Sequence, residues 1–257
     1  MPAEGEDTRP MLYQQKRVGG SAVTAPSPAE GCFFMPAQRA LIFANGPQID
    51  IEAVRALIRP EDYRIAADGG LHHLDRLGLL PDLLIGDLDS VESGEVEALE
   101  ANQVRIERHP VHKNETDLEL AVEAAVRAGC TSLLILGGLG GRLDMTLANI
   151  FLLRLPELAG LDARFDDGRE EVFLIESGNT HPREGRVIEG RAGDTVSLLP
   201  LDGPASGIHT SGLSYPLRGE TLFAERSRGV SNVMVASQAR VIVETGRLIC
   251  IHTRQPS

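Results

Sequence analysis

From Arg39 onward, short apolar runs alternate with stretches in which apolar residues recur at helical spacing. A short apolar run bounded by turn residues is typical of a buried strand, whereas apolar residues three and four positions apart form one face of a helix. The pattern predicts strands over residues 40–44, 63–67, 83–86, 104–109 and 132–136. It predicts helices over residues 51–58, around Leu71, Leu74 and Leu77, over 95–103 with a solvated face, and over about 117–128 and 144–153. This alternation indicates a mostly parallel sheet covered by helices on both faces.

After about residue 166 the pattern changes to strand-like pieces separated by Gly and Pro, with no helical spacing among them. These pieces are residues 172–177, 186–190, 194–200, 213–219, 239–246 and 247–253. Many short strands with frequent turns are typical of a β-sandwich or barrel. The sequence therefore predicts a three-layer α/β/α domain over residues 37–166 and an all-β sandwich domain over residues 167–257.

The first 36 residues mix Gly, Pro, Ser and Thr with scattered charges and show no hydrophobic repeat. They also lack the continuous apolar core of a secretory signal. Such a composition cannot bury enough apolar surface to offset the entropy of ordering. We expect residues 1–36 to form a disordered extension whose deletion leaves activity unchanged.

Charge, hydropathy and cysteine content argue against nucleic-acid and membrane partners and favour a reducing compartment. The formal net charge is −12, and Lys and Arg do not gather in clusters, which argues against a nucleic-acid partner. No apolar run approaches the roughly 18 residues of a membrane span, so we expect a soluble protein with no membrane partner. The three cysteines form no CxxC pair, which favours the reducing cytoplasm and core positions for Cys130 and Cys250.

Two carboxylates follow one predicted strand in LLIGDLDS, residues 83–90. Ligands of such sheets gather at the carboxyl ends of the strands. In an extended chain, residues two apart point to the same side, so Asp87 and Asp89 are expected to converge. Converging carboxylates repel unless a cation lies between them, which predicts a hard divalent ion that bridges to phosphate. The alternative is that Asp89 and Ser90 cap the following acidic stretch.

Other carboxylates also follow predicted strands. In AADGG, Asp68 directly follows a predicted strand, and Gly69 and Gly70 would let the backbone approach a ligand closely, or would simply form a turn. Thr116 and the glutamate three residues later match a capping box, which places Asp117 in the first helical turn, where it also favours the helix dipole. Each position has an ordinary structural explanation, but their coincidence at successive strand ends favours a shared site.

A glycine-rich loop, LGGLGGRLD, follows the strand that ends at residue 136 and leads into a helix. Free backbone N–H groups at a helix start can hold phosphate. Arg142 is available as a charged clamp, and Asp144 lies behind it. The loop is therefore a candidate phosphate site.

Several segments, taken in order, resemble the thiamine pyrophosphokinase family in its bacterial form. They are ADGGLHHLDRLGLLPDLLIGDLDS, KNETDLELAVEAA, GGLGGRLDMTLANI, GDTVSLLPL, GLSYPL and SRGVSN, and the resemblance runs from about Ala40 to the C-terminus. It implies Mg²⁺-dependent transfer of pyrophosphate from ATP to thiamine with release of AMP. It also implies a homodimer whose sites lie at the subunit interface, with a nucleotide-binding α/β domain and a thiamine-binding β domain.

The resemblance implies roles for individual residues. The catalytic acidic cluster would be Asp68, Asp87, Asp89 and Asp117, of which Asp87, Asp89 and Asp117 would hold the metal ion. The residues expected to bind nucleotide are Asn45, Gly69, Gly70, Lys113, Thr116, Gly138, Gly141 and Arg142. The residues expected to bind thiamine are Asp144, Ser231 and Asn232, the last two from the neighbouring subunit.

The chain departs from the family pattern at Asn114, Met145 and Val233, where relatives commonly carry Asp, His and Glu. It also has no tryptophan, so a ring that stacks on thiamine would be Tyr215, Phe223 or another side chain. These changes leave two alternatives to the enzyme open: a catalytically impaired sensor of thiamine or nucleotide, and a metal-dependent nucleotide hydrolase.

Histidines next to the expected site are expected to have ordinary roles. His72 and His73 are adjacent and therefore face different sides of their helix, so surface and packing roles are expected. His109 and His112 are likewise expected to be structural.

Overall fold

The computed structural model describes residues 39–47, 49–177 and 185–256. The extension expected over residues 1–36 lies outside these described residues. None of the described helices is long and apolar enough to cross a membrane.

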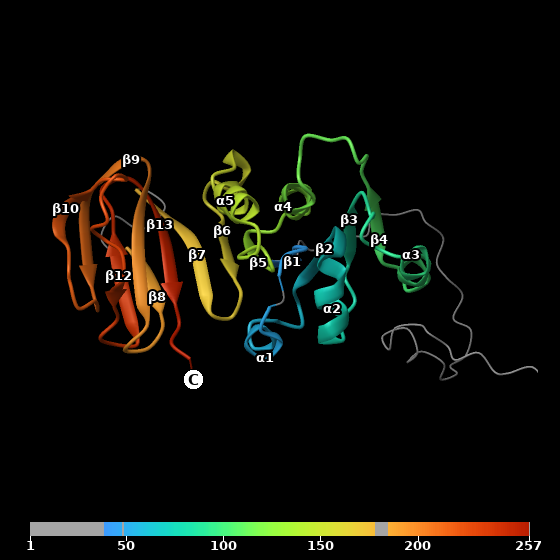
Figure 1. Ribbon diagram of the computed structural model, residues 1–257, viewed down its shortest axis with the longest axis horizontal. Helices are drawn as coiled ribbons and strands as arrows, with labels where there is room; N and C mark the ends of the chain where they lie inside the picture. The colour runs from blue at the N-terminus through green and yellow to red at the C-terminus, as the bar shows by residue number, and fades with distance from the viewer. Residues whose placement is uncertain (1–38, 48, 178–184, 257) are drawn as a thin grey trace, which may run out of the picture.

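Six parallel strands form the first part of the sheet (Figure 1). They are β1 (Arg39–Phe43), β2 (Tyr63–Ala67), β3 (Leu83–Gly86), β4 (Arg105–Arg108), β5 (Ser132–Leu136) and β6 (Asp162–Asp166). Their order is β4-β3-β2-β1-β5-β6, so the direction of winding reverses between β1 and β5. Loops diverge at such a reversal and leave a crevice at the carboxyl ends of the strands. All five strands predicted for this part are present, whereas β6 was not predicted.

Helices cover both faces of this sheet, as predicted (Figure 1). One face carries α1 (Ile51–Arg55), α2 (Leu71–Leu77) and α3 (Ser93–Ala101), and the other carries α4 (Asp117–Arg127) and α5 (Leu143–Leu152). Two short 3₁₀ turns, η2 (Asp68–Gly70) and η3 (Pro156–Leu158), complete this part. The face on which each helix lies follows from the right-handed crossovers between parallel strands. The first three connections run in one direction along the sheet and the next two run in the other, so their helices lie on opposite faces.

Two expected helices differ in detail from the prediction. The helix expected over 51–58 ends at Arg55, because the next backbone bonds join residues three apart and tighten the turn before Pro60. The helix expected to be a solvated surface buries Val96 and Leu99 against the sheet. These two residues lie three positions apart and therefore share one face.

The two faces of the sheet enclose separate hydrophobic cores. Side chains of β1 alternate between them: Ala40 and Ile42 pack under α4, whereas Leu41 and Phe43 pack under α2. Cys130 is buried in the first of these cores, and Cys250 is buried in a third core formed by the later strands. Both cysteines are therefore core residues, as predicted.

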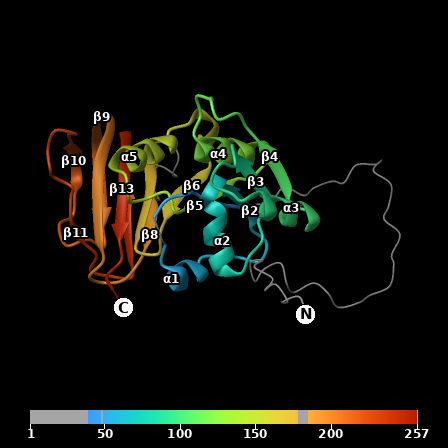
Figure 2. The same cartoon turned by 45° about the vertical axis from the view of Figure 1, so that its right-hand side comes forward.

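The later strands are β7 (Glu170–Glu176), β8 (Arg186–Glu189), β9 (Thr195–Ser211), β10 (Arg218–Leu222), β11 (Asn232–Val233), β12 (Gln238–Ile242) and β13 (Thr245–Thr253). They lie at one end of the molecule (Figure 2). The long β9 pairs with β13 along its first half and with β10 and β12 along its second half, so it belongs to both layers around the third core. This arrangement confirms the predicted all-β part, and its strands pair antiparallel.

The boundary predicted at residue 166 falls between β6 and β7. Hydrogen bonding continues across it, because β7 pairs with β6 on one side and with β13 on the other, both antiparallel. Of the strand expected over residues 213–219, residues 213–217 form a loop with an isolated bridge from Leu213 to Met234, and β10 begins at Arg218. The division into two functional domains stays a prediction.

Asp75 on α2 leads to a stability prediction. Burial, followed by the nearby Glu95 carboxylate, raises its pKa from 3.8 to about 6, and its buried Oδ1 has no hydrogen-bond partner among the described residues. A carboxyl that binds its proton more tightly in the folded state makes the protein less stable as pH rises from about 4 to about 6. Because Asp75 is only partly buried and solvent screens part of the effect, we expect Asp75→Asn to raise the free energy of unfolding by about 1–2 kcal/mol at pH 7.5 and to change it little at pH 4.

Urea unfolding at both pH values measures this effect. Glu100→Gln, on the exposed side of α3, removes the same charge without relieving burial and is the matched control. If the gain in the free energy of unfolding is equal at both pH values, or equal in both variants, the buried Asp75 carboxylate is not its cause.

Candidate active site

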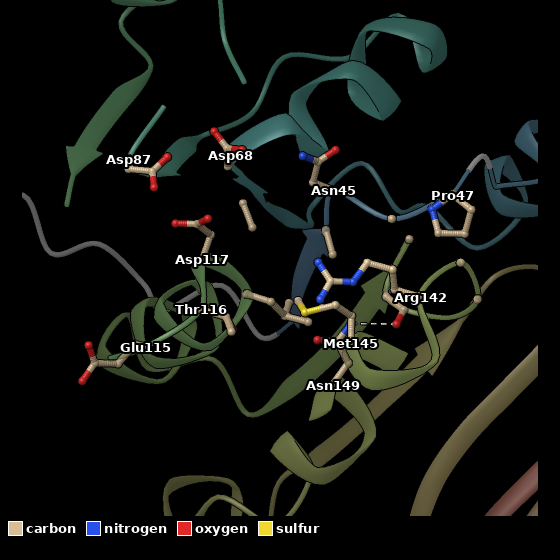
Figure 3. A pocket seen from close by; sticks show the side chains of 18 of the residues that line it. Asn45, Pro47, Asp68, Asp87, Glu115, Thr116, Asp117, Arg142, Met145 and Asn149 are labelled. Atoms are coloured by element: carbon tan, nitrogen blue, oxygen red, sulfur yellow. Dashed lines mark hydrogen bonds between the residues drawn. The ribbon is translucent and has the colours of Figure 1, made fainter. Parts of the chain in front are cut away.

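A cavity of about 600 Å³ opens at the carboxyl ends of the parallel strands, in the crevice where the winding reverses (Figure 3). A volume of this size suits a ligand as large as a nucleotide. Its walls are the loop after β1 (Ala44, Asn45, Gly46, Pro47), residues after β2, β3 and β4 (Ala67, Asp68, Asp87, Val111, Lys113, Glu115, Thr116, Asp117, Leu118), and the region after β5 (Gly137, Gly138, Gly140, Gly141, Arg142, Met145, Asn149). We call this cavity the strand-end pocket.

Three carboxylates meet at one side of this pocket; Asp68 and Asp87 line it, whereas Asp89 does not. Asp68, Asp87 and Asp89 each offer an oxygen, and these oxygens lie within 4.8 Å of one another. The convergence predicted for Asp87 and Asp89 is therefore present, but the extended backbone expected to produce it is not. Leu88 has a left-handed φ of 63° and turns its side chain into the core, and the Asp89 N–H donates to Asp87 Oδ1 at 3.2 Å. The capping alternative is wrong, because the N-cap of α3 is Glu92.

Asp68 is the most enclosed member of the cluster. It is 4% exposed, its φ is 47°, and its Oδ1 is buried with no hydrogen-bond partner in the described part of the chain. A buried, unpartnered carboxylate oxygen is costly unless a cation or proton satisfies it. Three convergent hard oxygens with one such orphan fit a divalent cation such as Mg²⁺.

Asp117 adjoins this cluster but has a different partner. Its Oδ1 accepts from Lys113 Nζ at 2.7 Å, and the same ammonium lies 3.7 Å from Asp87 Oδ2. Gly86 makes the approach of β3 to α4 possible, since a Cβ there would lie 3.0 Å from Asp117 Oδ1. The oxygens that the structure groups for a metal are thus those of Asp68, Asp87 and Asp89, whereas the expected set contained Asp117 in place of Asp68.

Lys113 is a protonated group at the pocket. Burial alone would lower its pKa, but the hydrogen bond and charge of Asp117, together with the charge of Asp87, outweigh this and raise the pKa. Thr116 fixes the start of α4, because its Oγ1 accepts from the Glu119 N–H at 3.2 Å. The predicted N-cap and the place of Asp117 in the first turn are confirmed.

The glycine-rich loop after β5 forms the opposite wall. Gly138 and Gly141 line the pocket as expected, and Gly141 has a φ of 70°, which favours glycine. Asn149, which sequence reasoning missed, is buried in α5 and donates from Nδ2 to the Gly138 carbonyl at 2.8 Å. An Asn inside the otherwise apolar stretch of residues 147–152 was the available signal.

Arg142 and Asp144 lie at the start of α5. Arg142 lines the pocket and forms an exposed pair with Asp144, with Nη2 and Oδ2 2.6 Å apart. This hydrogen bond lowers the pKa of the Asp144 carboxyl and raises that of the Arg142 guanidinium. Asp144 itself is not among the pocket-lining residues.

Asn45 and the Gly69-Gly70 pair lie where β1 meets the start of α2. Asn45 Nδ2 donates to Ser90 Oγ at 3.5 Å, and Ser90 Oγ donates to Asp89 Oδ1 at 3.2 Å, which links the loop after β1 to the carboxylates. Gly69 and Gly70 do not line the pocket. A Cβ on Gly70 would lie 2.0 Å from the Phe43 carbonyl oxygen, so this glycine allows close packing on β1.

Ser231 and Asn232 lie in the β part, outside the strand-end pocket. Asn232 Oδ1 accepts from the Tyr215 N–H at 3.0 Å, and its Nδ2 donates to the Tyr215 carbonyl at 2.7 Å. Asn232 therefore holds the loop that exposes the Tyr215 ring. Within one chain, these residues and the pocket are separate.

The three departures from the family pattern occupy different places. Met145 lines the pocket, so replacing a polar group here changes its wall. Asn114 is exposed and does not line the pocket, and Val233 belongs to β11 in the β part.

Two family models match the chain. "Thiamin pyrophosphokinase, catalytic domain" matches residues 54–163, and "Thiamin pyrophosphokinase, vitamin B1 binding domain" matches residues 184–250. Together the two matches span more than half of the sequence. The first contains the carboxylate cluster and the glycine-rich loop.

Curated relatives and solved structures agree with these models. The thiamine pyrophosphokinase of Bacillus subtilis is 24% identical over 212 residues, which are 82% of this chain and 97% of the relative. Thiamine pyrophosphokinase 1 of rice is 25% identical over 74% of this chain and 79% of the relative. The solved B. subtilis structure has a TM-score of 0.73 at 24% identity, covering 85% of this chain and all of that one. The Candida albicans structure has a TM-score of 0.71 at 16% identity, covering 85% of this chain and 90% of that one.

Proposed function

Because the chain belongs to the thiamine pyrophosphokinase family and is a thiamine diphosphokinase, we propose that ATP is its donor, Mg²⁺ its metal ion and AMP its second product. The thiamine hydroxyl oxygen forms a bond to the β-phosphorus of ATP. The bond from that phosphorus to the oxygen of the α-phosphate breaks, AMP leaves, and the hydroxyl proton is released. No covalent enzyme intermediate is needed, so catalysis rests on positioning and on stabilising phosphate charge.

The observation that supports this proposal most strongly is the cluster of Asp68, Asp87 and Asp89. Its first two members line a pocket that also contains Lys113 and has the glycine-rich loop as its opposite wall. A site that only bound a neutral or cationic molecule would have no use for a protonated lysine beside three carboxylates. A triphosphate would use both kinds of group: the lysine ammonium would bind its oxygens directly, and the carboxylates would hold the metal ion that it shares.

We assign the metal ion to Asp68, Asp87 and Asp89, with Asp117 close by. Bound Mg²⁺ would neutralise triphosphate charge and help to orient the leaving group. The chain's own groups do the remaining work. The Lys113 ammonium, held between Asp117 and Asp87, offers a charged donor to phosphate oxygens. Arg142 and the backbone N–H groups near Gly138 and Gly141 offer further donors on the opposite wall.

Thiamine is assigned to the β part of a neighbouring subunit in a homodimer. Ser231 and Asn232 lie outside the pocket of their own chain, so a second chain would have to present them to it. Exposed apolar side chains give such a dimer contact surface: Leu143, Leu147 and Phe151 share one face of α5, and Tyr215 and Val235 lie on the β part.

Label from [γ-³²P]ATP tests the transfer step. Pyrophosphoryl transfer places the γ-label in thiamine diphosphate, and neither thiamine monophosphate nor inorganic phosphate accumulates as a labelled product. Label that appears first in thiamine monophosphate would show stepwise phosphorylation and contradict attack at the β-phosphorus.

A further inference from the structure

Two polar side chains of α5 hold the glycine-rich loop by its backbone. Asn149 is 8% exposed, and its Nδ2 donates to the Gly138 carbonyl at 2.8 Å. Three residues earlier in the helix, Thr146 Oγ1 donates to the Gly140 carbonyl, also at 2.8 Å. Residues three apart are neighbours on a helix surface, so both side chains reach the loop from one face of α5.

The bond from Thr146 to the loop differs from the usual contact of a helical threonine. Its Oγ1 also lies 3.1 Å from the Arg142 carbonyl, four residues earlier, which is the bond that a Thr side chain commonly makes within a helix. A hydroxyl has one proton to donate, and the Gly140 carbonyl is the nearer acceptor. The hydroxyl of Thr146 therefore joins the helix to the loop.

These bonds fix the orientation of two peptide groups in the loop. In a trans peptide the C=O and N–H point in opposite directions, so a held carbonyl also fixes the direction of the next residue's N–H. The N–H groups concerned are those of Leu139 and Gly141, and neither donates a hydrogen bond within the described part of the chain. Both N–H groups are therefore available to an anion.

The loop itself is poorly suited to fixing these directions. Gly137, Gly140 and Gly141 have φ values of 69°, 82° and 70°. Glycine adopts positive and negative φ about equally readily, so a loop built from it has many accessible conformations. The side chains of α5 supply the constraint that the glycines lack.

We propose that Asn149 and Thr146 are positioning residues for the phosphate chain of the nucleotide. Their hydrogen bonds hold the two carbonyls on the α5 side, which keeps the N–H groups of Leu139 and Gly141 in the orientation that phosphate oxygens require. This inference rests on the proposed function, which places nucleotide phosphate at this loop. Donors that are fixed in advance bind more tightly than donors that must first be ordered.

Replacements that keep the shape of the side chain test the bonds. Thr146→Val removes the hydroxyl, Thr146→Ser retains it, and Asn149→Leu keeps the branching of the side chain without a donor. The probe is α,β-methylene-ATP with Mg²⁺, in which the bond that would break is not hydrolysable. We expect Thr146→Val and Asn149→Leu each to raise its dissociation constant about five- to tenfold, whereas Thr146→Ser stays within about twofold of wild type.

Calorimetric titration of the full chain, together with thermal unfolding curves, measures these effects. Thr253→Val is the matched control, because it removes a part-buried hydroxyl that donates to Glu170 Oε1 in the β part, and it should leave the affinity unchanged. The proposal is overturned if Thr146→Val binds the analogue as tightly as wild type, or if Thr146→Ser binds it as weakly as Thr146→Val. Lower thermal stability with unchanged affinity would likewise show that the bonds serve the fold alone. If Asn149→Leu does not fold, the two Thr146 variants still give the answer.

Failure of the proposed function gives a different result, because binding of the analogue does not require turnover. If the wild type binds the analogue but forms no thiamine diphosphate, the proposed reaction is wrong, whereas the affinities of the variants still test the inference. If the wild type does not bind the analogue, the inference is overturned.

Discussion

Asp87→Asn and Asp89→Asn are each expected to lower kcat by about three orders of magnitude or more, with the fold intact. Each substitution keeps the shape of the side chain and removes one charge from three oxygens that lie within 4.8 Å of one another. The loss of preorganised charge at a phosphoryl-transfer site commonly costs about 10²–10³ per group, and a weakened metal site adds to it. Folding should not suffer, because removing one of several neighbouring like charges relieves repulsion.

Kinetics with MgATP and thiamine, together with thermal unfolding curves, measure this prediction. Glu97→Gln on α3 is exposed, removes the same charge and should leave turnover unchanged. Raising the Mg²⁺ concentration should recover part of the loss in either Asp variant, because the substitution weakens a ligand. Near-normal turnover in both variants would show that the cluster does not hold the metal ion.

Arg39→Met is expected to lower the free energy of unfolding by about 3–5 kcal/mol, the usual cost of leaving a buried charge without its partner. Arg39 donates to both oxygens of Asp62, at 2.7 and 2.6 Å, and to the Leu57 carbonyl. The Asp62 side chain is 0% exposed and also accepts from the Arg59 N–H. The pair ties the start of β1 to the chain that enters β2.

Urea unfolding at pH 7 measures the loss. Arg105→Met, which removes an exposed partner of Glu107, is the matched control and should cost less than about 1 kcal/mol. The double replacement Arg39→Met with Asp62→Leu should recover much of the stability, since no charge is then left buried. If Arg39→Met alone lowers the free energy of unfolding by less than about 1 kcal/mol, the buried Arg39–Asp62 pair does not stabilise the fold as inferred.

The elements that sequence reasoning predicted are those whose signal is local. The apolar run 132–136 and the helical spacing after Thr116 each specify an element from neighbouring residues alone. By contrast, β6 reads DARFD, and its charged residues are satisfied by partners distant in sequence, such as Arg186 with Asp162. A pairing between residues 24 positions apart leaves no periodic trace.

The candidate site, too, could be predicted from the sequence only where its signal is local. Asp68 and Asp87 were predicted because each directly follows a predicted strand, and Asp89 because it lies two residues after Asp87. Their geometry was not, because the left-handed backbone of Leu88 depends on burying that side chain in the core.

Gly69 and Gly70, expected at a ligand, do not line the pocket. Gly70 packs on Phe43 of β1 and Gly69 on the Asn45 side chain, and only the folded chain defines these contacts. Asn149 was missed because its partner, the Gly138 carbonyl, is eleven residues away across a turn.

The most direct test of the proposed reaction is release of AMP from MgATP by the purified protein, with and without thiamine, with thiamine diphosphate followed in the same samples. The account predicts equal amounts of AMP and thiamine diphosphate, and neither product without thiamine. AMP formed without thiamine would point to nucleotide hydrolysis. No turnover with thiamine still bound would point to a sensor, and either result would contradict pyrophosphoryl transfer.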